Sequence, residues 1–355
     1  MLLLVLIVVF SLCNDLIQSE RNPKQIHVLF RHGERSPTGT YPNDPHKGHK
    51  WEGGLGYLTN KGKSQMYSLG QNVRAHYENF LPRYYWPAEV NFTSSQWDRC
   101  LMSAELFGAG LFPPHDFQIW NSDVLWQPIP VHYLPRNLDN LVAMKTNCTK
   151  YDKQFIEVQN SAKVQQYNQD YADLYNYLSQ HTGKIINNIE DVESLFNTLE
   201  IYQLNNLSTP YWVNDTLMNE MKIIAAQNLA IYSETEYMKK IKGGFFLKTI
   251  LDLMETALNG TKDVPTINTY SGHDLTIVHV MRALNLIDTL KPNFGACLIF
   301  ELYEDSTIKV FYWDKWNGKI IEQILPNCAS PCTVSNFIEG YKAVLPVNWA
   351  RECEL

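Results

Sequence analysis

Apolar runs and helical repeats alternate in the first part of the chain. The apolar run Gln25–Phe30 predicts a buried strand, which leads into the loop Arg31–Pro37. From Thr59 onward, which suits a helix N-cap, apolar residues recur every three or four positions, at Met66, Leu69, Val73, Tyr77 and Phe80. Residues Glu89–Thr93 alternate like a second strand, and a helical pattern begins near Arg99. Two strand-then-helix units predict an α/β sheet.

Residues 146–260 follow a different pattern, rich in Asn, Gln, Tyr and Leu, with no convincing strand. Apolar residues recur there at helical spacing in three stripes: Tyr167, Tyr171 and Leu174; Met218, Met221, Ile224 and Ala225; Phe246, Ile250, Leu253 and Ala257. We interpret the tyrosine stripe as core packing. The segment is therefore predicted to be a helical cap inserted into the α/β domain.

The α/β pattern returns after the predicted cap. Val264–Tyr270 is expected to be a strand and Leu275–Leu286 a helix, while Cys297–Tyr303 and Thr307–Trp313 are expected to form an antiparallel hairpin. The predicted fold class is α/β, with a mixed central sheet flanked by helices and a smaller, mostly helical cap. Residues 20–145 and 261–355 would form the α/β domain, and 146–260 the cap.

The first twelve residues, MLLLVLIVVFSL, are almost purely apolar. Because a membrane span needs about 20 residues, this run predicts a signal peptide over residues 1–19, cleaved after Cys13 or Ser19. A buried N-terminal strand or helix is the alternative. No later window holds 18 uninterrupted apolar residues, and the polar C-terminus lacks a lipid-anchor tail. We expect a protein without a membrane span after cleavage, secreted or delivered to the lysosomal lumen.

The cysteines and sequons agree with an oxidising compartment. Seven cysteines are present, and loss of Cys13 would leave six. Cys328 and Cys332 flank Ala-Ser-Pro, a turn that makes a local disulfide plausible; a zinc site lacks a second close cysteine pair. Five N-x-S/T sequons are candidates for glycosylation, at Asn91, Asn147, Asn206, Asn214 and Asn259.

Charge and composition narrow the ligand classes. The 355-residue chain is 45% hydrophobic and 19% charged, which is ordinary for a globular protein. Its 30 Lys and Arg against 37 Asp and Glu leave a net charge of −7, which indicates neither nucleic acid nor an anionic membrane as partner. A phosphate-bearing ligand would therefore need a local basic cluster.

Such a cluster follows the predicted strand ends. Ligands bind beyond the carboxyl ends of strands in an open α/β sheet. Arg31, His32 and Arg35 follow the first strand, where Gly33 lets the backbone approach a ligand closely. Arg99 follows the second strand. The third is followed by His273 and Asp274, directly before a helix N-terminus that favours an anion. A solvated basic loop is the alternative to an anion site.

Phosphoryl transfer suits these residue types, because it needs cations, an in-line nucleophile and a proton for the leaving group. His32 is the candidate nucleophile and Asp274 the candidate general acid. Neighbouring cations would lower the pKa of Asp274, which favours an acidic working pH. The expected phosphate ligands are Arg31, Arg35, Arg99 and a protonated His273.

Four motifs resemble those of the histidine acid phosphatases, the branch of the phosphoglycerate-mutase-like superfamily that includes prostatic, lysosomal and insect venom acid phosphatases. They are RHGERSP at 31–37, Leu58-Thr59-x-x-Gly62, Asp98-Arg99-x-x-Met102-Ser103-Ala104 and Ser271-Gly272-His273-Asp274. The resemblance runs from Ile26 to Cys353. It implies an α/β domain with a helical cap and a phosphohistidine intermediate on His32, with Asp274 as proton donor. It further implies small phosphate monoesters or phosphoproteins as substrates, neither metal nor other cofactor, and the possibility of a homodimer.

The same resemblance bears on the cysteines. It implies the disulfides Cys148–Cys353 and Cys328–Cys332, whereas the partner of the family's third bridge, expected near Asn205, is missing. Cys100 and Cys297 therefore either pair with each other or stay free. Glu34 also departs from the usual pattern, in which this position is Asp.

Three other functions are alternatives to an acid phosphatase. A metal-dependent phosphoesterase is suggested by Asp44-x-His46, but the remaining ligand motifs are absent. A phytase would need additional Lys and Arg around the pocket. A non-catalytic secreted binding protein on the same scaffold would be expected to lose the nucleophile, an arginine or the acid. Because the chain keeps all of them, an active acid phosphatase is the preferred interpretation.

Overall fold

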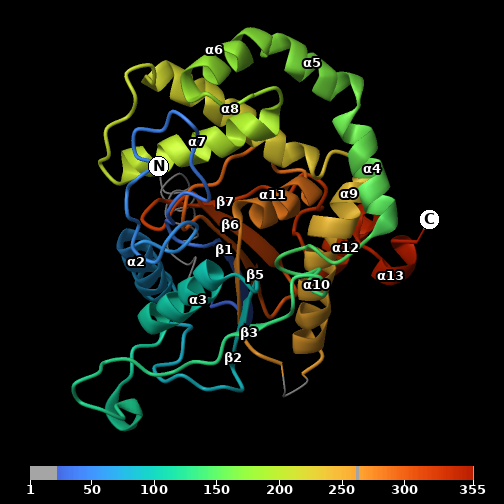
Figure 1. Ribbon diagram of the computed structural model, residues 1–355. Helices are drawn as coiled ribbons and strands as arrows, with labels where there is room; N and C mark the ends of the chain where they lie inside the picture. The colour runs from blue at the N-terminus through green and yellow to red at the C-terminus, as the bar shows by residue number, and fades with distance from the viewer. Residues whose placement is uncertain (1–21, 261–263, 355) are drawn as a thin grey trace, which may run out of the picture.

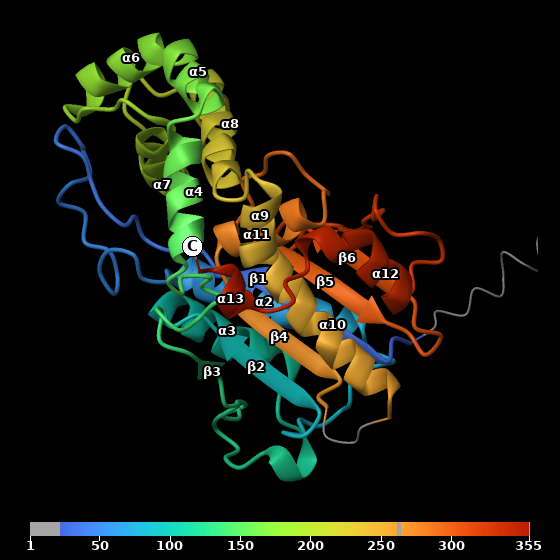
Figure 2. The same cartoon turned by 90° about the vertical axis from the view of Figure 1, so that its right-hand side faces the viewer.

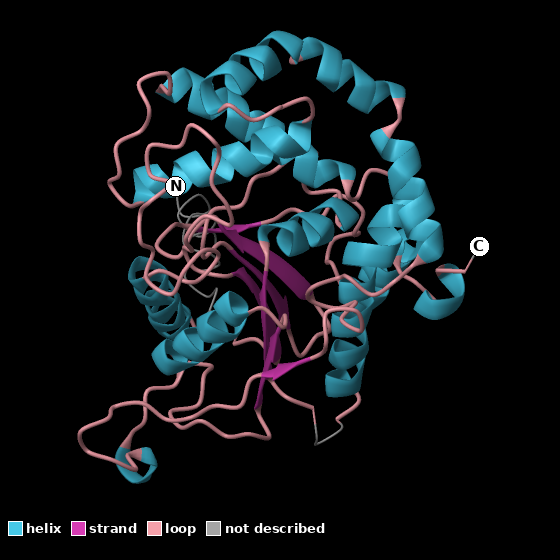
Figure 3. Cartoon of the chain, viewed as in Figure 1, coloured by secondary structure: helices cyan, strands magenta, loops and turns pink. Residues whose placement is uncertain are grey.

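The structure, a computed structural model, describes residues 22–260 and 264–354, and the predicted signal peptide lies outside these residues. A seven-stranded mixed sheet forms its centre, in the order β3-β2-β4-β1-β5-β6-β7 (Figure 3). The strands are β1 (Gln25–Arg31), β2 (Val90–Ser94), β3 (His132–Tyr133), β4 (Ile267–Gly272), β5 (Cys297–Leu302), β6 (Ile308–Trp313) and β7 (Ile320–Glu322). The predicted mixed α/β sheet is confirmed.

The register of the parallel strands brings three strand ends together. β4 pairs with β1 and with β2 in parallel, so that Arg31 lies opposite Gly272 and Ser94 lies opposite Ser271. The loops that follow β1, β2 and β4 therefore leave the same edge of the sheet. β5 runs antiparallel to β1, so that its first residue, Cys297, also lies at this edge.

Helices cover both faces of the sheet (Figures 1 and 2). α2 (Asn60–His76) and α3 (Asp98–Leu111) pack against one face, and α10 (Phe245–Leu258), α11 (Asp274–Ala283) and α12 (Val334–Tyr341) against the other. The alternation of side chains in the strands explains this division, because successive residues of a strand point to opposite faces. In β1, Val28 and Phe30 contribute to the α2–α3 side, whereas Leu29 contributes to the α10–α11 side.

The expected cap segment divides between two cores. Six helices arch over the carboxyl-end edge of the sheet (Figure 1), and they share a core of their own. They are α4 (Thr149–Gln159), α5 (Ala162–Asp170), α6 (Ala172–Thr182), α7 (Ile189–Leu204), α8 (Asp215–Ile231) and α9 (Glu236–Lys239). α10 lies in the same segment of sequence but packs its buried side chains, such as Phe246 and Ile250, on the sheet.

The cysteines tie the C-terminus to this arch. Cys148, at the N-cap of α4, forms a disulfide with Cys353, just after α13 (Trp349–Glu352), and Cys328 forms one with Cys332. The structure thus contains both disulfides that the family resemblance implies. Cys100 and Cys297 are free and buried, which answers the question that the sequence left open.

Most element boundaries lie close to the predicted ones. Thr59 caps α2, and its hydroxyl accepts a hydrogen bond from the Gly62 amide. Two short strands at the sheet edges, β3 and β7, were not predicted, because two or three residues carry no readable alternation. Within the described residues, no helix is both long and apolar enough to span a bilayer.

Candidate active site

His32 lies at the meeting point of the strand ends. Its imidazole is buried, and Nδ1 lies 2.8 Å from the carbonyl oxygen of Gly33. A hydrogen bond to a carbonyl requires the proton on Nδ1, so that Nε2 carries a lone pair and no proton. Arg99 Nε donates to this Nε2 at 3.1 Å. Burial, followed by the charges of Arg99 and Arg31, holds the pKa of His32 well below its ordinary value. The geometry therefore presents a neutral imidazole with an available nitrogen.

Asp274 stands in a buried ion cluster at the start of α11. Its Oδ2 lies 3.0 Å from Arg31 Nη2 and 2.9 Å from Lys291 Nζ. Burial by itself raises the pKa of this carboxyl, but the charges of Arg31 and Lys291 outweigh it and hold the pKa well below the ordinary value. Without a ligand, Asp274 is therefore a carboxylate with two cationic partners.

Arg31 is held in place by its surroundings. Its guanidinium stacks 3.9 Å from the centroid of the Phe294 ring and donates from Nη1 to the carbonyl of Pro292. Arg35 is also buried, and burial with the nearby charges of Arg99 and Arg31 lowers its pKa to about 10. Arg35 therefore remains cationic at physiological pH. The site thus keeps a high density of positive charge away from water, as binding of a phosphate dianion requires.

His273 differs from the expectation in one respect. The ring lies 5.6 Å from that of His32, and its Nε2 is 2.9 Å from Ser95 Oγ. Burial, together with the charge of Arg99, lowers its pKa to about 3. Without a ligand the ring is therefore neutral rather than protonated, because no carboxylate outweighs its burial. As a neutral ring, it offers one N–H to a phosphate oxygen. The Cys100 thiol lies 3.7 Å from His273 Nε2, and burial raises the pKa of this thiol to about 12.

Gly33 permits a close contact with helix α2, whereas the sequence predicted a close contact with a ligand. A Cβ at this position would lie 2.4 Å from the carbonyl oxygen of Gly62, and a Cβ on Gly62 would lie 2.0 Å from the carbonyl oxygen of Glu34. The two glycines let the first turn of α2 approach the loop after β1, rather than a ligand. This contact fixes the position of the loop that carries His32.

Glu34 connects the same loop to the cap. Its side chain is fully buried and accepts hydrogen bonds from Thr59 Oγ1 at 3.1 Å and from Asn205 Nδ2 at 2.8 Å, with Lys61 Nζ at 3.6 Å. Asn205 is the C-cap of α7. The longer side chain of Glu, at a position where Asp is usual, therefore spans the gap between the loop and the cap.

Lys291 and Glu193 are the residues that the sequence analysis missed. Lys291 Nζ bridges Asp274 Oδ2 and Glu193 Oε1, the latter at 2.8 Å, and Glu193 belongs to α7 of the cap. Their neighbours Pro292 and Phe294, which hold Arg31, were also missed. The sequence did contain a signal for Lys291, Pro292 and Phe294. They lie just before β5, and because β5 runs antiparallel to β1, the segment that precedes it lies at the carboxyl-end edge of the sheet.

The residues of the metal hypothesis have other partners. Asp44 accepts hydrogen bonds from the His46 amide and, at 2.6 Å, from the Tyr202 hydroxyl, while His46 Nε2 lies 2.8 Å from the Ser208 carbonyl oxygen. Over residues 22–260 and 264–354, no three His, Cys, Asp or Glu side chains gather in a way that could hold a metal ion.

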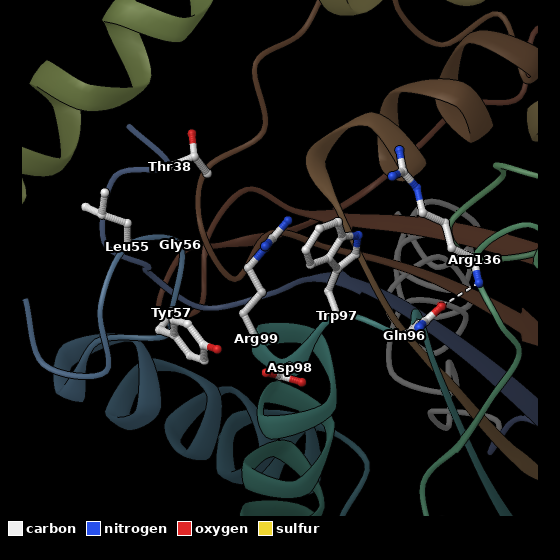
Figure 4. A pocket seen from close by; sticks show the side chains of 9 residues that line it. All are labelled: Thr38, Leu55, Gly56, Tyr57, Gln96, Trp97, Asp98, Arg99 and Arg136. Atoms are coloured by element: carbon white, nitrogen blue, oxygen red, sulfur yellow. Dashed lines mark hydrogen bonds between the residues drawn. The ribbon is translucent and has the colours of Figure 1, made fainter. Parts of the chain in front are cut away.

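Two cavities open beside the site. One of about 730 Å³ is lined by Arg99 together with Trp97, Tyr57, Leu55 and Arg136 (Figure 4). A smaller one of about 300 Å³ shares Trp97, Arg99 and Arg136 with it and reaches His273 and Asp274. The candidate site is therefore open to a ligand along the wall formed by these shared residues.

Comparison with known proteins agrees with this geometry. The sequence model of the histidine phosphatase superfamily (branch 2) matches residues 24–315. The chain belongs to this superfamily. This histidine phosphatase is 32% identical over 347 residues to lysosomal acid phosphatase of Homo sapiens, covering 94% of the chain and 81% of that protein. It is 32% identical over 339 residues to prostatic acid phosphatase of Bos taurus, with 93% and 87% covered. It is thus an enzyme of the acid phosphatase type, which hydrolyses phosphate monoesters.

Solved structures share the fold. The histidine phosphatase resembles the phytase of Hafnia alvei with a TM-score of 0.71 and 17% identity, covering 95% of this chain and 99% of that one. A multiple inositol polyphosphate phosphatase of Bifidobacterium longum resembles it with a TM-score of 0.56 and 12% identity, covering 89% and 91%. At these identities the likeness shows the fold alone.

The Lys291→Met substitution tests the ion cluster. It leaves the Asp274 and Glu193 carboxylates facing each other without their shared cation, and we expect it to lower the free energy of unfolding by about 3–5 kcal/mol at pH 7. The pKa of Asp274 is depressed in the folded state, so that its contribution is present above its unfolded value of about 3.9 and is lost as the pH falls further. The loss should therefore shrink in urea titrations at pH 3.5.

Lys309→Met is the matched control, because the Lys309–Glu322 pair lies on the surface and is partly exposed. This change should cost less than about 1 kcal/mol. Equal losses for the two variants would contradict a stabilising role for the buried cluster.

Proposed function

We propose that this acid phosphatase works through a phosphohistidine on His32. Nε2 attacks the phosphorus, the P–O bond to the leaving group breaks, and Asp274 gives its proton to the departing oxygen. Water then attacks the phosphorus, and Asp274 takes a proton from that water. The P–N bond to Nε2 breaks, and inorganic phosphate leaves. The hydrogen bond from Nδ1 to the Gly33 carbonyl carries the proposal, because it leaves Nε2 unprotonated, as a nucleophile must be.

Two buried guanidinium groups and one partly buried one supply the charge that this reaction needs. Arg31, Arg35 and Arg99 surround His32 and would bind the phosphoryl oxygens in the ground state and stabilise the charge that develops in the transition state. The neutral His273 would add one N–H donor, oriented by Ser95. Because these donors are already desolvated, little reorganisation is required when the ester binds.

The two pKa shifts explain why acidic conditions suit the mechanism. The depressed pKa of His32 keeps the imidazole neutral, and therefore nucleophilic, as the pH falls below its ordinary value of about 6.5. Asp274 must carry a proton to act as an acid. A bound phosphate dianion competes for Arg31 and so weakens the interaction that holds the pKa of Asp274 low. Acidic pH then supplies the proton.

An acid phosphatase is better supported than the alternatives. The curated relatives at about 32% identity are acid phosphatases, whereas the phytases resemble the chain in fold only. Arg136 and Lys145 also line the cavities, but Glu190 and Glu193 line the same cavity as Lys145. Their negative charge offsets the additional positive charge that a phytase substrate would need. A non-catalytic binding protein would not require a neutral imidazole among buried cations.

We propose that the mature protein is glycosylated and is secreted or resides in the lysosomal lumen. Two disulfides fit an oxidising compartment. Four of the sequon asparagines are exposed, and these are Asn147, Asn206, Asn214 and Asn259. Asn91 is half-buried within β2, which makes it the weakest of the five candidates.

We further propose that two copies of the chain associate through the loop of residues 113–138. This loop extends from the body of the molecule (Figure 3) and exposes large apolar side chains: Phe117, Ile119, Trp120, Val124, Leu125, Trp126, Tyr133, Leu134 and Leu138. It also carries β3, an edge strand that pairs only with β2 and so leaves its other side open. A second copy would cover the apolar side chains and extend the sheet.

Replacing the nucleophile tests the main proposal. We expect His32→Ala to lower kcat on 4-nitrophenyl phosphate by at least about 10⁴-fold, since the covalent route is lost. Acid-quenched incubation with labelled substrate should trap phosphohistidine in the wild type and none in the variant. His76→Ala, at the exposed end of α2, is the control. Normal turnover in His32→Ala would refute the assignment.

Replacing the proton donor tests the role of Asp274. In Asp274→Asn, kcat/KM for glycerol 2-phosphate should fall by about 10²–10⁴-fold, because its alkoxide needs a proton. The loss on 4-nitrophenyl phosphate should be far smaller, since nitrophenolate leaves unprotonated. Asp252→Asn, on the exposed side of α10, serves as control. Equal losses on both esters would argue against a proton donor.

Sedimentation tests the association of two copies. The wild-type protein should sediment as a dimer, and Leu125→Glu, which places a charge on a side chain that is 73% exposed, should yield monomers. Ile185→Glu changes an equally exposed apolar residue, at 78%, outside the loop of residues 113–138 and should remain dimeric. A monomeric wild type would contradict the proposal.

A further inference from the structure

The cavity of about 730 Å³ beside Arg99 has no task in the phosphate chemistry described above. Its position beside the reacting groups indicates a role in binding the leaving group. Arg99 donates to the nucleophilic Nε2 of His32 and also lines the cavity. Trp97 and Arg136 line both this cavity and the smaller one that contains Asp274. A leaving group whose oxygen lies near Asp274 therefore has this cavity as its continuation.

The walls of the cavity are partly aromatic. In Figure 4 the Arg99 side chain lies between Tyr57 and Trp97, and Leu55 lies above Tyr57. All three are large apolar residues with 43–48% of their surface exposed, which is costly unless a ligand covers them. Flat indole and phenol rings suit a planar ring more than a hydroxyl-rich polyol.

A cation without an acidic partner completes the cavity. The Arg136 guanidinium lies 5.9 Å from the Trp97 ring centroid, and no ion pair to it occurs among the described residues. Its backbone amide donates a hydrogen bond to Gln96 Oε1 at 2.6 Å. In Figure 4 the Asp98 carboxylate lies below Trp97, away from this guanidinium. An anionic group on the ligand would be the counterion of Arg136.

We propose that this cavity is the leaving-group subsite, and that it selects aryl phosphate monoesters whose ring carries an anionic substituent. The ring lies in the cavity lined by Tyr57, Arg99 and Trp97, and the substituent reaches Arg136. The inference rests on the proposed function and adds the substrate class. It differs from a phytase, whose substrate would need several cations instead of an aromatic wall.

Three esters separate the contributions: glycerol 2-phosphate, phenyl phosphate and 4-carboxyphenyl phosphate. The measured parameter is kcat/KM. It reports the steps up to the first P–O cleavage, during which the leaving group is still part of the substrate. In Trp97→Ala, the preference for phenyl over glycerol phosphate should fall by about tenfold. Tyr57→Ala provides a second route to the same result. Arg99 stacks on Trp97 at 4.9 Å, so that Trp97→Ala can also disturb Arg99. Such a disturbance would affect all three esters alike, and it therefore cancels in the ratio of two kcat/KM values measured on the same variant.

The charge is tested by Arg136→Gln. The preference for 4-carboxyphenyl over phenyl phosphate should fall by about two- to fivefold, and in the wild type it should shrink as salt rises from 0.01 to about 1 M. Trp86→Ala and Arg83→Gln are matched controls. Trp86 is 43% exposed against 45% for Trp97, but it precedes β2 and so lies at the opposite edge of the sheet. Arg83 is an exposed arginine paired with Asp116.

Two results would overturn the inference: unchanged ratios in Trp97→Ala, Tyr57→Ala and Arg136→Gln, or a wild-type preference for inositol hexakisphosphate over 4-carboxyphenyl phosphate. In either case, turnover of these esters that depends on His32 would leave the proposed function standing. Failure to hydrolyse any ester, or full activity of His32→Ala, would instead contradict the proposed function itself.

Discussion

A buried row of alternating charges holds the candidate site together. Arg31, Asp274, Lys291 and Glu193 follow one another at distances of 2.8–3.0 Å, and they come from β1, α11, the segment before β5 and the cap helix α7. Buried charges are tolerated only when they are paired, so each member requires its neighbours. The sheet edge, the helix N-terminus and the cap are thereby held in one arrangement.

The same low-polarity surroundings separate the roles of groups with similar chemistry. Burial beside cations keeps both imidazoles neutral, whereas the guanidinium groups stay charged because their pKa values start so high. The carboxyl of Asp274 responds in the opposite direction, as a carboxylate stabilised by two cations. A nucleophile, a set of phosphate ligands and a proton carrier therefore arise from one electrostatic environment.

The groups for the reaction and the residues that line the outer cavity come from different parts of the α/β body. The parallel strand ends carry the groups for phosphoryl transfer, and the cap contacts them through Glu193 with Lys291 and through Asn205 with Glu34. The outer cavity is built differently, from the loop around Leu55 and Tyr57, the residue Trp97 before α3, and Arg136 in the loop after β3. Loops of this kind can change the leaving group that is accepted without altering the phosphate ligands.

The sequence alone determined the mixed α/β fold, the helical character of the cap, the motif residues from His32 to Asp274 and the pairs Cys148–Cys353 and Cys328–Cys332. The fold and the helical cap follow from periodicity, and the site residues follow from motifs that are contiguous in the chain. The two disulfide pairs follow from the family resemblance that these motifs carry. Only the tertiary structure decided that α10 packs on the sheet, that His273 is neutral, and that Lys291, Glu193 and Arg136 adjoin the site. Burial and pairing between distant segments set these properties, and neither leaves a local pattern along the chain.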